Sequence, residues 1–412
     1  MKGGFYLMNT NPPKGTDSAL FTPIVINGLE IKNRIVKAPT MESMATEEGA
    51  PTDRLVKHYT RAAKGGSGLL MMGLCSVSRE GRAYPRESGI YEDALVPQWK
   101  GFTDSVHEAG GRIVMQITHG GRQMDPDLIR GRKAKSASSM PNLFYLYRSQ
   151  RLTDREIIGI IKEFGDAAAR VKAAGFDAVQ IHASGGYLLA GFLSPLTNLR
   201  NDSWGGDEKR RFHIFEEIYR EVRQSVGSDY PVFAKLHLGD FLVMGHPFPA
   251  NYAAALRMQD LGVDALEFAI GIMETCTMTF SKGEMPVDVI DDHVGPLLKN
   301  YWKAVGLFYK PFSRVKKPYF RTAALELKRR GLTIPLLLAG GIRRFDDAES
   351  AVRSGTADLI GMSRPIIREP NLPRRWMNGD RRESSCVSCN RCLFDLINAN
   401  PIRCHYTKDS SS

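Results

Sequence analysis

Short apolar runs alternate with longer amphipathic stretches from about residue 34 to residue 370. The longer stretches repeat their apolar residues with the period of a helix, whereas the short runs are almost continuously apolar. Continuous apolar strands are typical of a parallel sheet that is buried on both faces. We predict eight strands, at residues 34–39, 68–73, 112–118, 177–182, 231–236, 264–269, 335–340 and 358–362.

Eight strands that alternate with helices predict an α/β fold, the (β/α)8 TIM barrel. Asp154 is the expected N-cap of the helix that runs to Ala174. A doubly wound sheet is the alternative, but it needs a G-x-G-x-x-G loop after its first strand, and the sequence has none. Several helical stretches end just before a strand at a glycine, as helix C-termini often do: Gly110, Gly175, Gly262, Gly331 and Gly355.

Two regions lie outside this alternation. Residues 22–33 have strand character on both sides of Asn27-Gly28, which predicts a β-hairpin that plugs the N-terminal mouth of the barrel. Residues 270–317 form a long insertion after strand six, which we expect to be a substrate lid; a plain surface excursion is the alternative. The predicted domains are a flexible leader (1–19), the barrel (20–376) and a cysteine-rich C-terminal extension (377–412).

Composition narrows the class of partner. The 412 residues carry a formal net charge of +11, but Lys and Arg are spread along the chain without a dense basic run that contains aromatics. We therefore expect no nucleic-acid partner and a cationic surface that attracts phosphorylated ligands. No apolar run reaches the length of a membrane helix, and the N-terminus lacks a signal-peptide core, so we expect no membrane association and a cytoplasmic location.

Active sites of such barrels are built at the C-terminal ends of the strands. Gly340-Gly341 follows the seventh strand here, and Arg364 follows the eighth. Glycine N–H groups approach a phosphate closely and a guanidinium binds two of its oxygens, so this pattern predicts a phosphate site. A plain turn and a surface ion pair are the alternative. The other strand ends carry Pro39, Thr40, Met41, Gly73, Gln116, His119, His182 and Lys235.

Seven segments resemble the old yellow enzyme family and occur in its order from about residue 20 to 370. They are LFTP at 20–23, NRIVKAP at 33–39, MQITHGGR at 115–122, FLSP at 192–195, NLRNDSWGG at 198–206, AGGI at 339–342 and SRP at 363–365, the last resembling the family's Gly-Arg-Pro. The resemblance implies an FMN-binding barrel that uses NAD(P)H as reductant.

The resemblance also implies the contacts with FMN. Gln116 would hydrogen-bond the pyrimidine edge of the flavin, and Lys235 would lie near flavin N1 and O2, where a cation stabilises the anionic reduced ring. The cofactor-binding residues along the ring would be Ala38, Pro39, Thr40 and Met41, with Gly73 beside them. Met41 takes the position next to flavin N5, where relatives carry Thr, Cys or His. The phosphate would be held by Gly340, Gly341, Ser363 and Arg364.

In such enzymes a reduced nicotinamide gives a hydride to the flavin. Flavin N5 then delivers it to the β-carbon of an activated alkene, and a tyrosine protonates the α-carbon. The family's pattern is His, two residues, then Asn or His, one residue, then Tyr, so the resemblance implies His182 and Tyr187 as catalytic residues. The second carbonyl-binding position is Gly185, which has no side chain to donate a hydrogen bond.

Four cysteines follow the barrel, and their spacing predicts one metal centre: Cys386, Cys389, Cys392 and Cys404. Position and spacing resemble trimethylamine dehydrogenase and 2,4-dienoyl-CoA reductase, which implies a 4Fe–4S cluster; structural zinc and free thiols are the alternatives. The chain ends eight residues after Cys404, so we expect the second nucleotide-binding half of those relatives to be absent.

The leading interpretation is an FMN-dependent ene-reductase that uses NAD(P)H on an α,β-unsaturated carbonyl or related compound. An amine or enoate oxidoreductase, fed by an external electron carrier through a C-terminal Fe–S cluster, is the alternative among enzymes. Outside enzymes, the alternative is a flavin redox sensor or electron carrier. The expected partners are a small-molecule substrate and a nicotinamide nucleotide; a homo-oligomer and an external electron carrier stay open.

Overall fold

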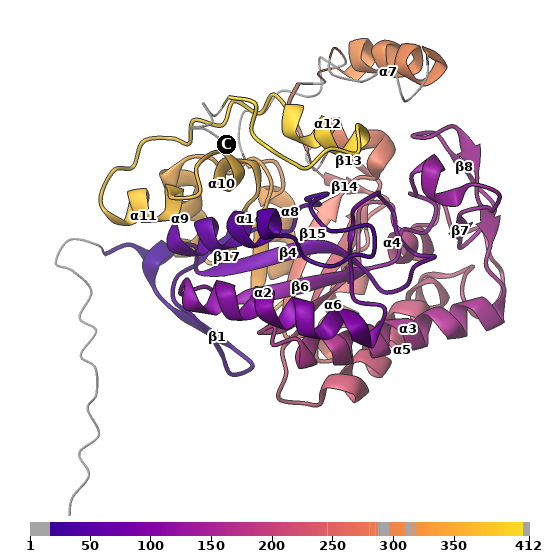
Figure 1. Ribbon diagram of the computed structural model, residues 1–412, viewed down its shortest axis with the longest axis horizontal. Helices are drawn as coiled ribbons and strands as arrows, with labels where there is room; N and C mark the ends of the chain where they lie inside the picture. Colours follow the sequence, from indigo (N-terminus) through magenta and orange to yellow (C-terminus); the bar gives the residue numbers. More distant parts are fainter. Residues whose placement is uncertain are drawn as a thin grey trace, which may run out of the picture.

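Parallel strands close into a barrel that is surrounded by helices (Figure 1). The structure is a computed structural model that describes residues 17–244, 246–279, 281–284, 286, 288, 296–309, 315 and 318–406. The barrel strands are β3 (Ile35–Lys37), β4 (Leu69–Ser76), β6 (Ile113–Thr118), β11 (Ala178–Ala183), β12 (Val232–Gly239), β15 (Ala265–Ile270), β16 (Leu336–Ala339) and β17 (Leu359–Met362). Because β3 pairs with both β17 and β4, the ring is closed. All eight predicted strands and the TIM barrel are confirmed.

Helices connect consecutive barrel strands. They are α1 (Asp53–Lys64), α2 (Val96–Glu108), α3 (Asp154–Ala173), α5 (Glu208–Val226), α6 (Tyr252–Asp260), α8 (Arg321–Arg329) and α9 (Phe345–Arg353), with α11 (Leu372–Met377) after the last strand. The predicted N-cap of α3 is wrong by one residue: the cap is Thr153, which exchanges hydrogen bonds with Glu156 in a capping box. Thr followed three residues later by Glu is the stronger signal, because both partners satisfy backbone N–H groups.

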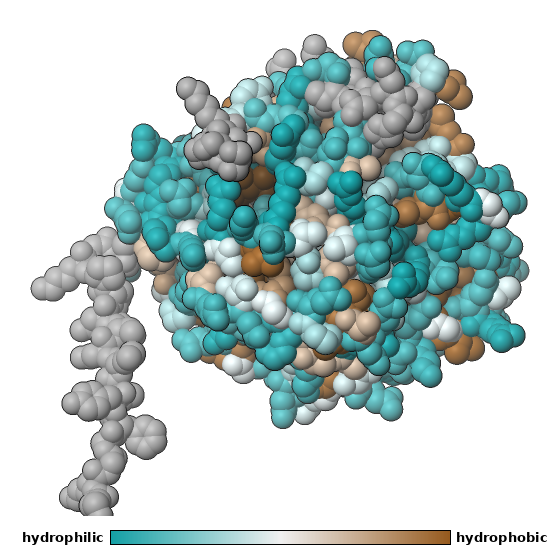
Figure 2. Space-filling view, viewed as in Figure 1, coloured by the Kyte–Doolittle hydropathy of each residue, from teal (hydrophilic) through white to brown (hydrophobic). Residues whose placement is uncertain are grey.

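Further strands and helices lie outside the barrel strands and their connecting helices. The strands among them are β5 (Ser88–Gly89), β7 (Lys135–Ser136), β8 (Pro141–Asn142), β9 (Tyr147–Arg148), β10 (Gln150–Arg151), β13 (Phe241–Val243) and β14 (His246–Phe248). The short helices are η1 (Ala19–Phe21), η2 (Asp93–Leu95), η3 (Pro126–Ile129), η4 (Met273–Met278), α4 (Leu188–Leu193), α10 (Arg364–Arg368) and α12 (Arg391–Ile397). The insertion after β15 also contains a longer helix, α7 (Pro296–Tyr309). The face seen in Figure 2 is mostly hydrophilic, with hydrophobic residues in small separate patches.

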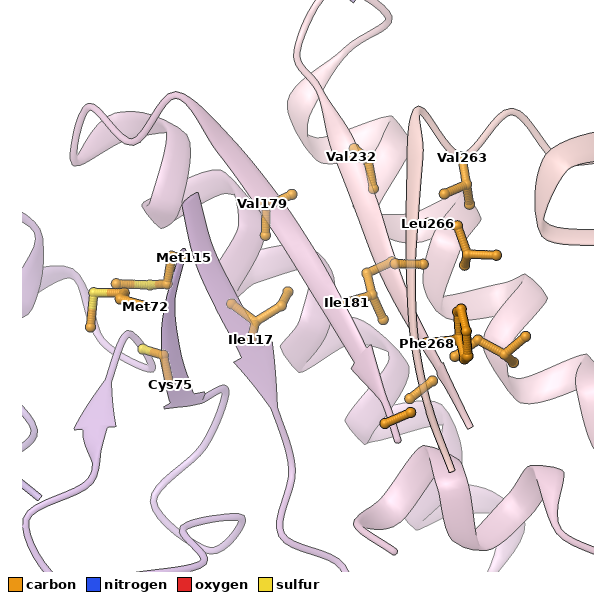
Figure 3. Close-up of a cluster of buried hydrophobic side chains, with 14 of the residues drawn as sticks. Met72, Cys75, Met115, Ile117, Val179, Ile181, Val232, Val263, Leu266 and Phe268 are labelled. Atoms are coloured by element: carbon orange, nitrogen blue, oxygen red, sulfur yellow. The ribbon is translucent and has the colours of Figure 1, made fainter. Parts of the chain in front are cut away.

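Side chains alternate between the two faces of each barrel strand. On β11, Val179 and Ile181 join a large apolar cluster that also contains helix residues such as Phe164 and Phe215, so this face points out of the barrel toward the helices. Figure 3 shows part of that cluster along β6, β11, β12 and β15. Ala178 belongs instead to a second cluster made only of strand and hairpin residues, which fills the inside of the barrel.

The hairpin of β1 (Ile24–Ile26) and β2 (Leu29–Ile31) closes the N-terminal mouth, as predicted. Asn27 and Gly28 both have positive φ, 42° and 78°, which a two-residue hairpin turn requires. The buried side chains of Ile26, Leu29 and Ile31 pack on the apolar layer inside the barrel. In Figure 1 this hairpin and α12 lie at opposite edges of the molecule.

Several predictions fall partly outside the described residues. Residues 1–16 of the predicted leader are among these, as are parts of the insertion after β15, of which η4 and α7 are described. Within the described part of the chain, no helix combines the length and the apolar character that crossing a membrane requires.

Candidate active site

A polar layer lies inside the barrel, one inward-facing position above the apolar layer. Gln116 and Gln180 stand opposite each other on β6 and β11, and Lys235 and Glu267 stand opposite each other on β12 and β15. Gln116 Nε2 donates to Gln180 Oε1 at 2.6 Å, and Gln180 Nε2 donates to Glu267 Oε2 at 3.1 Å. Lys235 Nζ lies 2.9 Å from Glu267 Oε1. The four side chains thus form one connected chain across the barrel, in which all but Lys235 are fully buried.

Sequence reasoning found two of these four residues. It predicted Gln116 and Lys235 as flavin contacts and missed Gln180 and Glu267, which tie them together. A signal was present, because each missed residue is a polar side chain inside an otherwise apolar strand. A buried polar group must find a partner, so Gln or Glu at an inward position of a barrel strand indicates a hydrogen-bonded layer.

A cavity opens above this layer at the C-terminal ends of the strands. Every residue that we predicted as catalytic or cofactor-binding lines it: Ala38, Pro39, Thr40, Met41, Gly73, Gln116, His182, Tyr187, Lys235, Gly340, Gly341, Ser363 and Arg364. Residues that lie far apart in the sequence are thus gathered around one space. Their individual roles stay predictions.

Glycines leave open space in the wall of this cavity. A Cβ on Gly73 would lie 2.6 Å from Gln116 Cβ, and a Cβ on Gly340 would lie 2.7 Å from the Tyr319 ring. Both distances are too short for real contacts, so these positions admit only glycine. Together with the polar layer below, the bare backbone forms a cradle into which a flat ring and its phosphate tail can fit, and the residues present suit FMN.

His182 and Tyr187 meet at the cavity, with ring centroids 5.2 Å apart. Burial, and then the charge of Lys235, hold the pKa of His182 well below its usual range, so the imidazole is neutral. Its Nδ1 is buried and has no hydrogen-bond partner. Burial, and then the neighbouring Tyr84, raise the pKa of Tyr187 well above its usual range, so its hydroxyl holds a proton.

The backbone at Gly185 explains why this position lacks a side chain. Gly185 has φ +70°, and a Cβ there would lie 3.2 Å from the Tyr187 ring. A side chain at residue 185 would therefore require the Tyr187 ring to shift slightly, and the positive φ adds backbone strain.

A second tyrosine, which sequence reasoning missed, stands next to Tyr187. The hydroxyl of Tyr84 lies 2.9 Å from the hydroxyl of Tyr187, and both residues line the cavity. Glu87 holds the Tyr84 loop, because its Oε2 accepts hydrogen bonds from the backbone N–H groups of Ala83 at 2.6 Å and Tyr84 at 3.0 Å. Burial raises the pKa of Glu87 to about 7. An aromatic residue shortly after a strand end was the available signal.

The C-terminal extension forms part of the cavity wall. Leu396 of α12 packs with Met41, Tyr84 and Tyr187 in one apolar cluster, and Cys392, Leu393 and Ile402 also line the cavity. The backbone N–H of Ile402 donates to the carbonyl of Glu42, directly after the segment predicted to follow the flavin ring. The sequence predicted an extension beyond the barrel but did not indicate that it covers the site.

The four cysteines of the extension line a second, smaller cavity, together with Arg364 and Arg368. Arg368 Nη1 donates to Cys404 Sγ at 3.7 Å. Burial raises the pKa of Cys392 to about 12, so its free thiol would stay protonated near neutral pH. Among the described residues, no three His, Cys, Asp or Glu side chains converge closely enough to hold a single metal ion.

Arg364 stands between the two cavities and lines both. Its Nη1 donates to the carbonyl of Lys282 at 2.8 Å and also to Asn390 Oδ1. Ser363, directly before it, shares a short hydrogen bond with the hydroxyl of Thr40. The predicted phosphate ligand is thus also the link between the barrel, the insertion and the cysteines.

Known proteins resemble this chain over most of its length. The NADH:flavin oxidoreductase / NADH oxidase family matches residues 19–307. A metal reductase of Desulforamulus reducens is 33% identical over 94% of this chain and 53% of its own length. An NADH oxidase of Thermoanaerobacter brockii is 31% identical over 90% of this chain and 52% of its own length. The chain therefore spans about half the length of these relatives.

A solved structure agrees with the fold. An old yellow enzyme homologue from Zymomonas mobilis superposes with a TM-score of 0.69 at 26% sequence identity, over 94% of this chain and 97% of the other. The shared barrel covers both the strands and the ends at which the candidate site lies.

Proposed function

The chain belongs to the NADH:flavin oxidoreductase / NADH oxidase family, and from that premise we propose that it is an FMN-dependent enzyme that reduces the activated C=C bond of an α,β-unsaturated carbonyl compound with NAD(P)H. The observation that carries the proposal is Tyr187, a buried and protonated phenol beside the neutral His182, at the rim of a glycine-lined cradle. A proton donor next to a site for a flat redox cofactor is the arrangement that alkene reduction needs.

FMN fits the residues of the cavity. Gln116 and Lys235 would hold the pyrimidine edge, and Gly340, Gly341, Ser363 and Arg364 would hold the phosphate. Bound there, FMN would supply the hydride-transfer chemistry between NAD(P)H and the β-carbon of the substrate. Glu267 holds Lys235 in place through the 2.9 Å contact and offsets part of its charge.

The remaining steps belong to side chains of this chain. His182, neutral and in the cavity wall, donates a hydrogen bond from its ring N–H to the substrate carbonyl oxygen. The Tyr84 hydroxyl lies 2.9 Å from the hydroxyl of Tyr187 and is placed to donate to it. Tyr187 Oη gives its proton to the α-carbon, and the Tyr84 hydroxyl donates to the phenolate that this leaves. Leu396 covers the site and excludes water.

Steady-state kinetics test the proposed reaction. The purified protein should carry FMN and oxidise NADH or NADPH in the presence of 2-cyclohexen-1-one, with the saturated ketone as product. A yellow, FMN-loaded protein that reduces none of a panel of enones, enals and enoate esters would contradict the proposal. Arg364→Ala should retain less FMN after gel filtration than the wild type, because a charge-assisted phosphate contact is lost.

We further propose that Cys386, Cys389, Cys392 and Cys404 hold one 4Fe–4S cluster that exchanges electrons with an external carrier. The four cysteines line one cavity, and their spacing resembles that of relatives that hold a 4Fe–4S cluster. Cys392 lines both cavities, so such a centre would adjoin FMN. The metal reductase of Desulforamulus reducens, one of the relatives, fits an electron acceptor outside the chain.

Anaerobic purification followed by iron, sulfide and zinc assays tests the cysteine site. Equal iron and sulfide, about four of each per chain, would support the cluster. Stoichiometric zinc would replace it with a structural ion. Neither metal, with the thiols open to titration, would reject both.

A further inference from the structure

The insertion after β15 is attached to the turn that carries the cysteines. We call residues 281–284 the pocket loop and residues 386–392 the cysteine turn. Asn390 Nδ2 donates to the carbonyl of Ser281 at 2.8 Å and to the carbonyl of Glu284 at 2.9 Å. In return, the backbone N–H of Glu284 donates to the carbonyl of Ser388 at 3.0 Å. Three hydrogen bonds therefore join two segments that lie about a hundred residues apart in the chain.

Asn390 is buried where the pocket loop meets the cysteine turn. It is 1% exposed and takes the left-handed conformation, with φ 58°, between Cys389 and Cys392. Its Oδ1 accepts from the guanidinium of Arg364, which also donates to the carbonyl of Lys282 at 2.8 Å. Both ends of the side-chain amide are thus satisfied by groups outside the turn, as a buried amide requires.

The two segments touch backbone to backbone. A Cβ on Gly283 would lie 2.1 Å from the carbonyl oxygen of Ser388 and 2.9 Å from Asn390 Nδ2. No side chain fits at residue 283 unless the pocket loop moves away from the cysteine turn. The position of one segment therefore fixes the position of the other.

Both segments lead into the wall of the candidate active site. Ser281 of the pocket loop lines the cavity. The cysteine turn continues directly into α12, whose Leu393 and Leu396 also line the cavity, and Leu396 belongs to the same apolar cluster as Tyr84 and Tyr187. One anchor point consequently holds two parts of the wall around the predicted proton donor.

We propose that the cysteine site holds the wall of the substrate pocket in place. Asn390 is the positioning residue, because its hydrogen bonds attach the pocket loop to the cysteine turn. A metal centre fixes the backbone of the turn that ligates it, because each thiolate is tied to the same centre. The fixed turn then holds α12 over the site and, through Asn390, the pocket loop beside it. The proposal rests on the proposed metal centre and goes beyond electron transfer, since it makes substrate binding depend on an intact cysteine site.

Asn390→Asp is the sharpest test. Aspartate keeps the shape, the oxygen that faces Arg364 and tolerance of the left-handed backbone, but it replaces the Nδ2 donor with an oxygen that faces two carbonyls. We expect the dissociation constant of 2-cyclohexen-1-one on the oxidised, FMN-loaded protein to rise about tenfold, since two hydrogen bonds are lost. The Glu284 amide should exchange with deuterium about tenfold faster, while iron and FMN contents stay at wild-type levels.

Two further variants and a control complete the design. Gly283→Ala pushes the pocket loop off the turn from the other side and should give the same pair of changes. Cys392→Ser, which disrupts the metal centre and leaves Asn390 intact, should speed exchange at Glu284 as well. Val387→Ala is the matched control, because Val387 belongs to the same turn but is 60% exposed and should change none of the readouts.

The outcomes separate this inference from the proposed reaction. Asn390→Asp with wild-type exchange at Glu284 would overturn the inference, whatever the enzyme reduces. Wild-type exchange in Cys392→Ser would show that the turn is rigid without its centre and would overturn it too. An absence of enone turnover in the wild type, with fast exchange in the variants, would reject the proposed substrate and leave the coupling in place.

Discussion

The two mouths of the barrel use the same strands but present different side chains. At the N-terminal mouth the inward positions are apolar, among them Val114, Ala178 and Phe233, and the hairpin covers them with Ile31. One inward position further along the same strands, the side chains are polar and form the connected layer below the candidate active site. Inward positions two residues apart on one strand thus serve different purposes: the first packs in the apolar core and the second belongs to the candidate active site.

The polar mouth contains groups that reduce stability. His182 Nδ1, Ser184 Oγ and Glu87 Oε1 are buried there without hydrogen-bond partners. A buried polar group without a partner costs about 1–3 kcal/mol, whereas the apolar side chains of the plug stabilise the fold. The barrel is thus stabilised by apolar packing at the hairpin mouth, whereas at the other mouth buried polar groups lack partners, and two of them, His182 and Ser184, line the cavity. Four substitutions test this difference between the hairpin mouth and the active-site mouth.

Tyr187→Phe should have the largest effect. Without the hydroxyl the α-carbon receives no proton from the enzyme, and loss of a positioned general acid slows a reaction by about 10²–10⁴-fold. The rate at which an enone reoxidises the reduced protein, followed in single turnovers, measures this step. Reduction by NAD(P)H should stay close to wild type. Equal losses in both half-reactions would point to a structural role for Tyr187.

Ile31→Ala should lower the free energy of unfolding by about 2–5 kcal/mol, because it removes fully buried methyl groups from the plug. Urea titration measures the change. The variant should keep wild-type kcat/KM where it remains folded, since it lies at the opposite mouth from the site. Val25→Ala, in the same hairpin but 63% exposed, is the control and should be neutral. A marked drop in kcat/KM would break the division between the two mouths.

Glu87→Gln should remove a dependence of stability on pH. The pKa of Glu87 is raised to about 7 by burial, so the folded state holds its proton more tightly than the unfolded state, where the pKa is 4.5. The wild type is therefore most favoured below pH 4.5 and loses up to about 3 kcal/mol as pH rises to 7. Glutamine can still accept from the two backbone N–H groups but cannot ionise. Urea unfolding at pH 5 and pH 8 should show a smaller loss in the variant; equal losses would assign the dependence elsewhere.

Tyr84→Phe should have the smallest effect, lowering kcat/KM for an enone about tenfold through the loss of one hydrogen bond to Tyr187. Thermal stability should change little, because the ring and its packing remain. The double variant with Tyr187→Phe is the decisive measurement. If the hydroxyls act as a pair, the second substitution adds little to the first, whereas fully multiplied losses would mean that they act independently.

Local sequence was sufficient to predict the barrel strands and the N-terminal hairpin. Continuous apolar runs predicted all eight barrel strands, because a strand buried on both faces must be apolar along its length. Asn27-Gly28 predicted the hairpin, since its turn needs two positive φ angles. The family resemblance and the flavin and nicotinamide cofactors that it implied are confirmed by the family match. The α3 N-cap was wrong because neighbouring residues, Thr153 and Asp154, are both good caps and only the partner Glu156 decides.

Only the tertiary structure decided how the site is completed. Tyr84 and Tyr187 are 103 residues apart, and the Gln180–Glu267 hydrogen bond spans 87 residues, so no local pattern links them. The placement of α12 over the cavity likewise depends on Leu396 meeting Tyr84 and Tyr187 in space. Helices and strands each have a characteristic spacing of apolar residues, and this spacing can be recognised within one short stretch of sequence. A hydrogen-bond partner is set by where the closed barrel brings distant strand ends together, and that is decided only once the ring has closed.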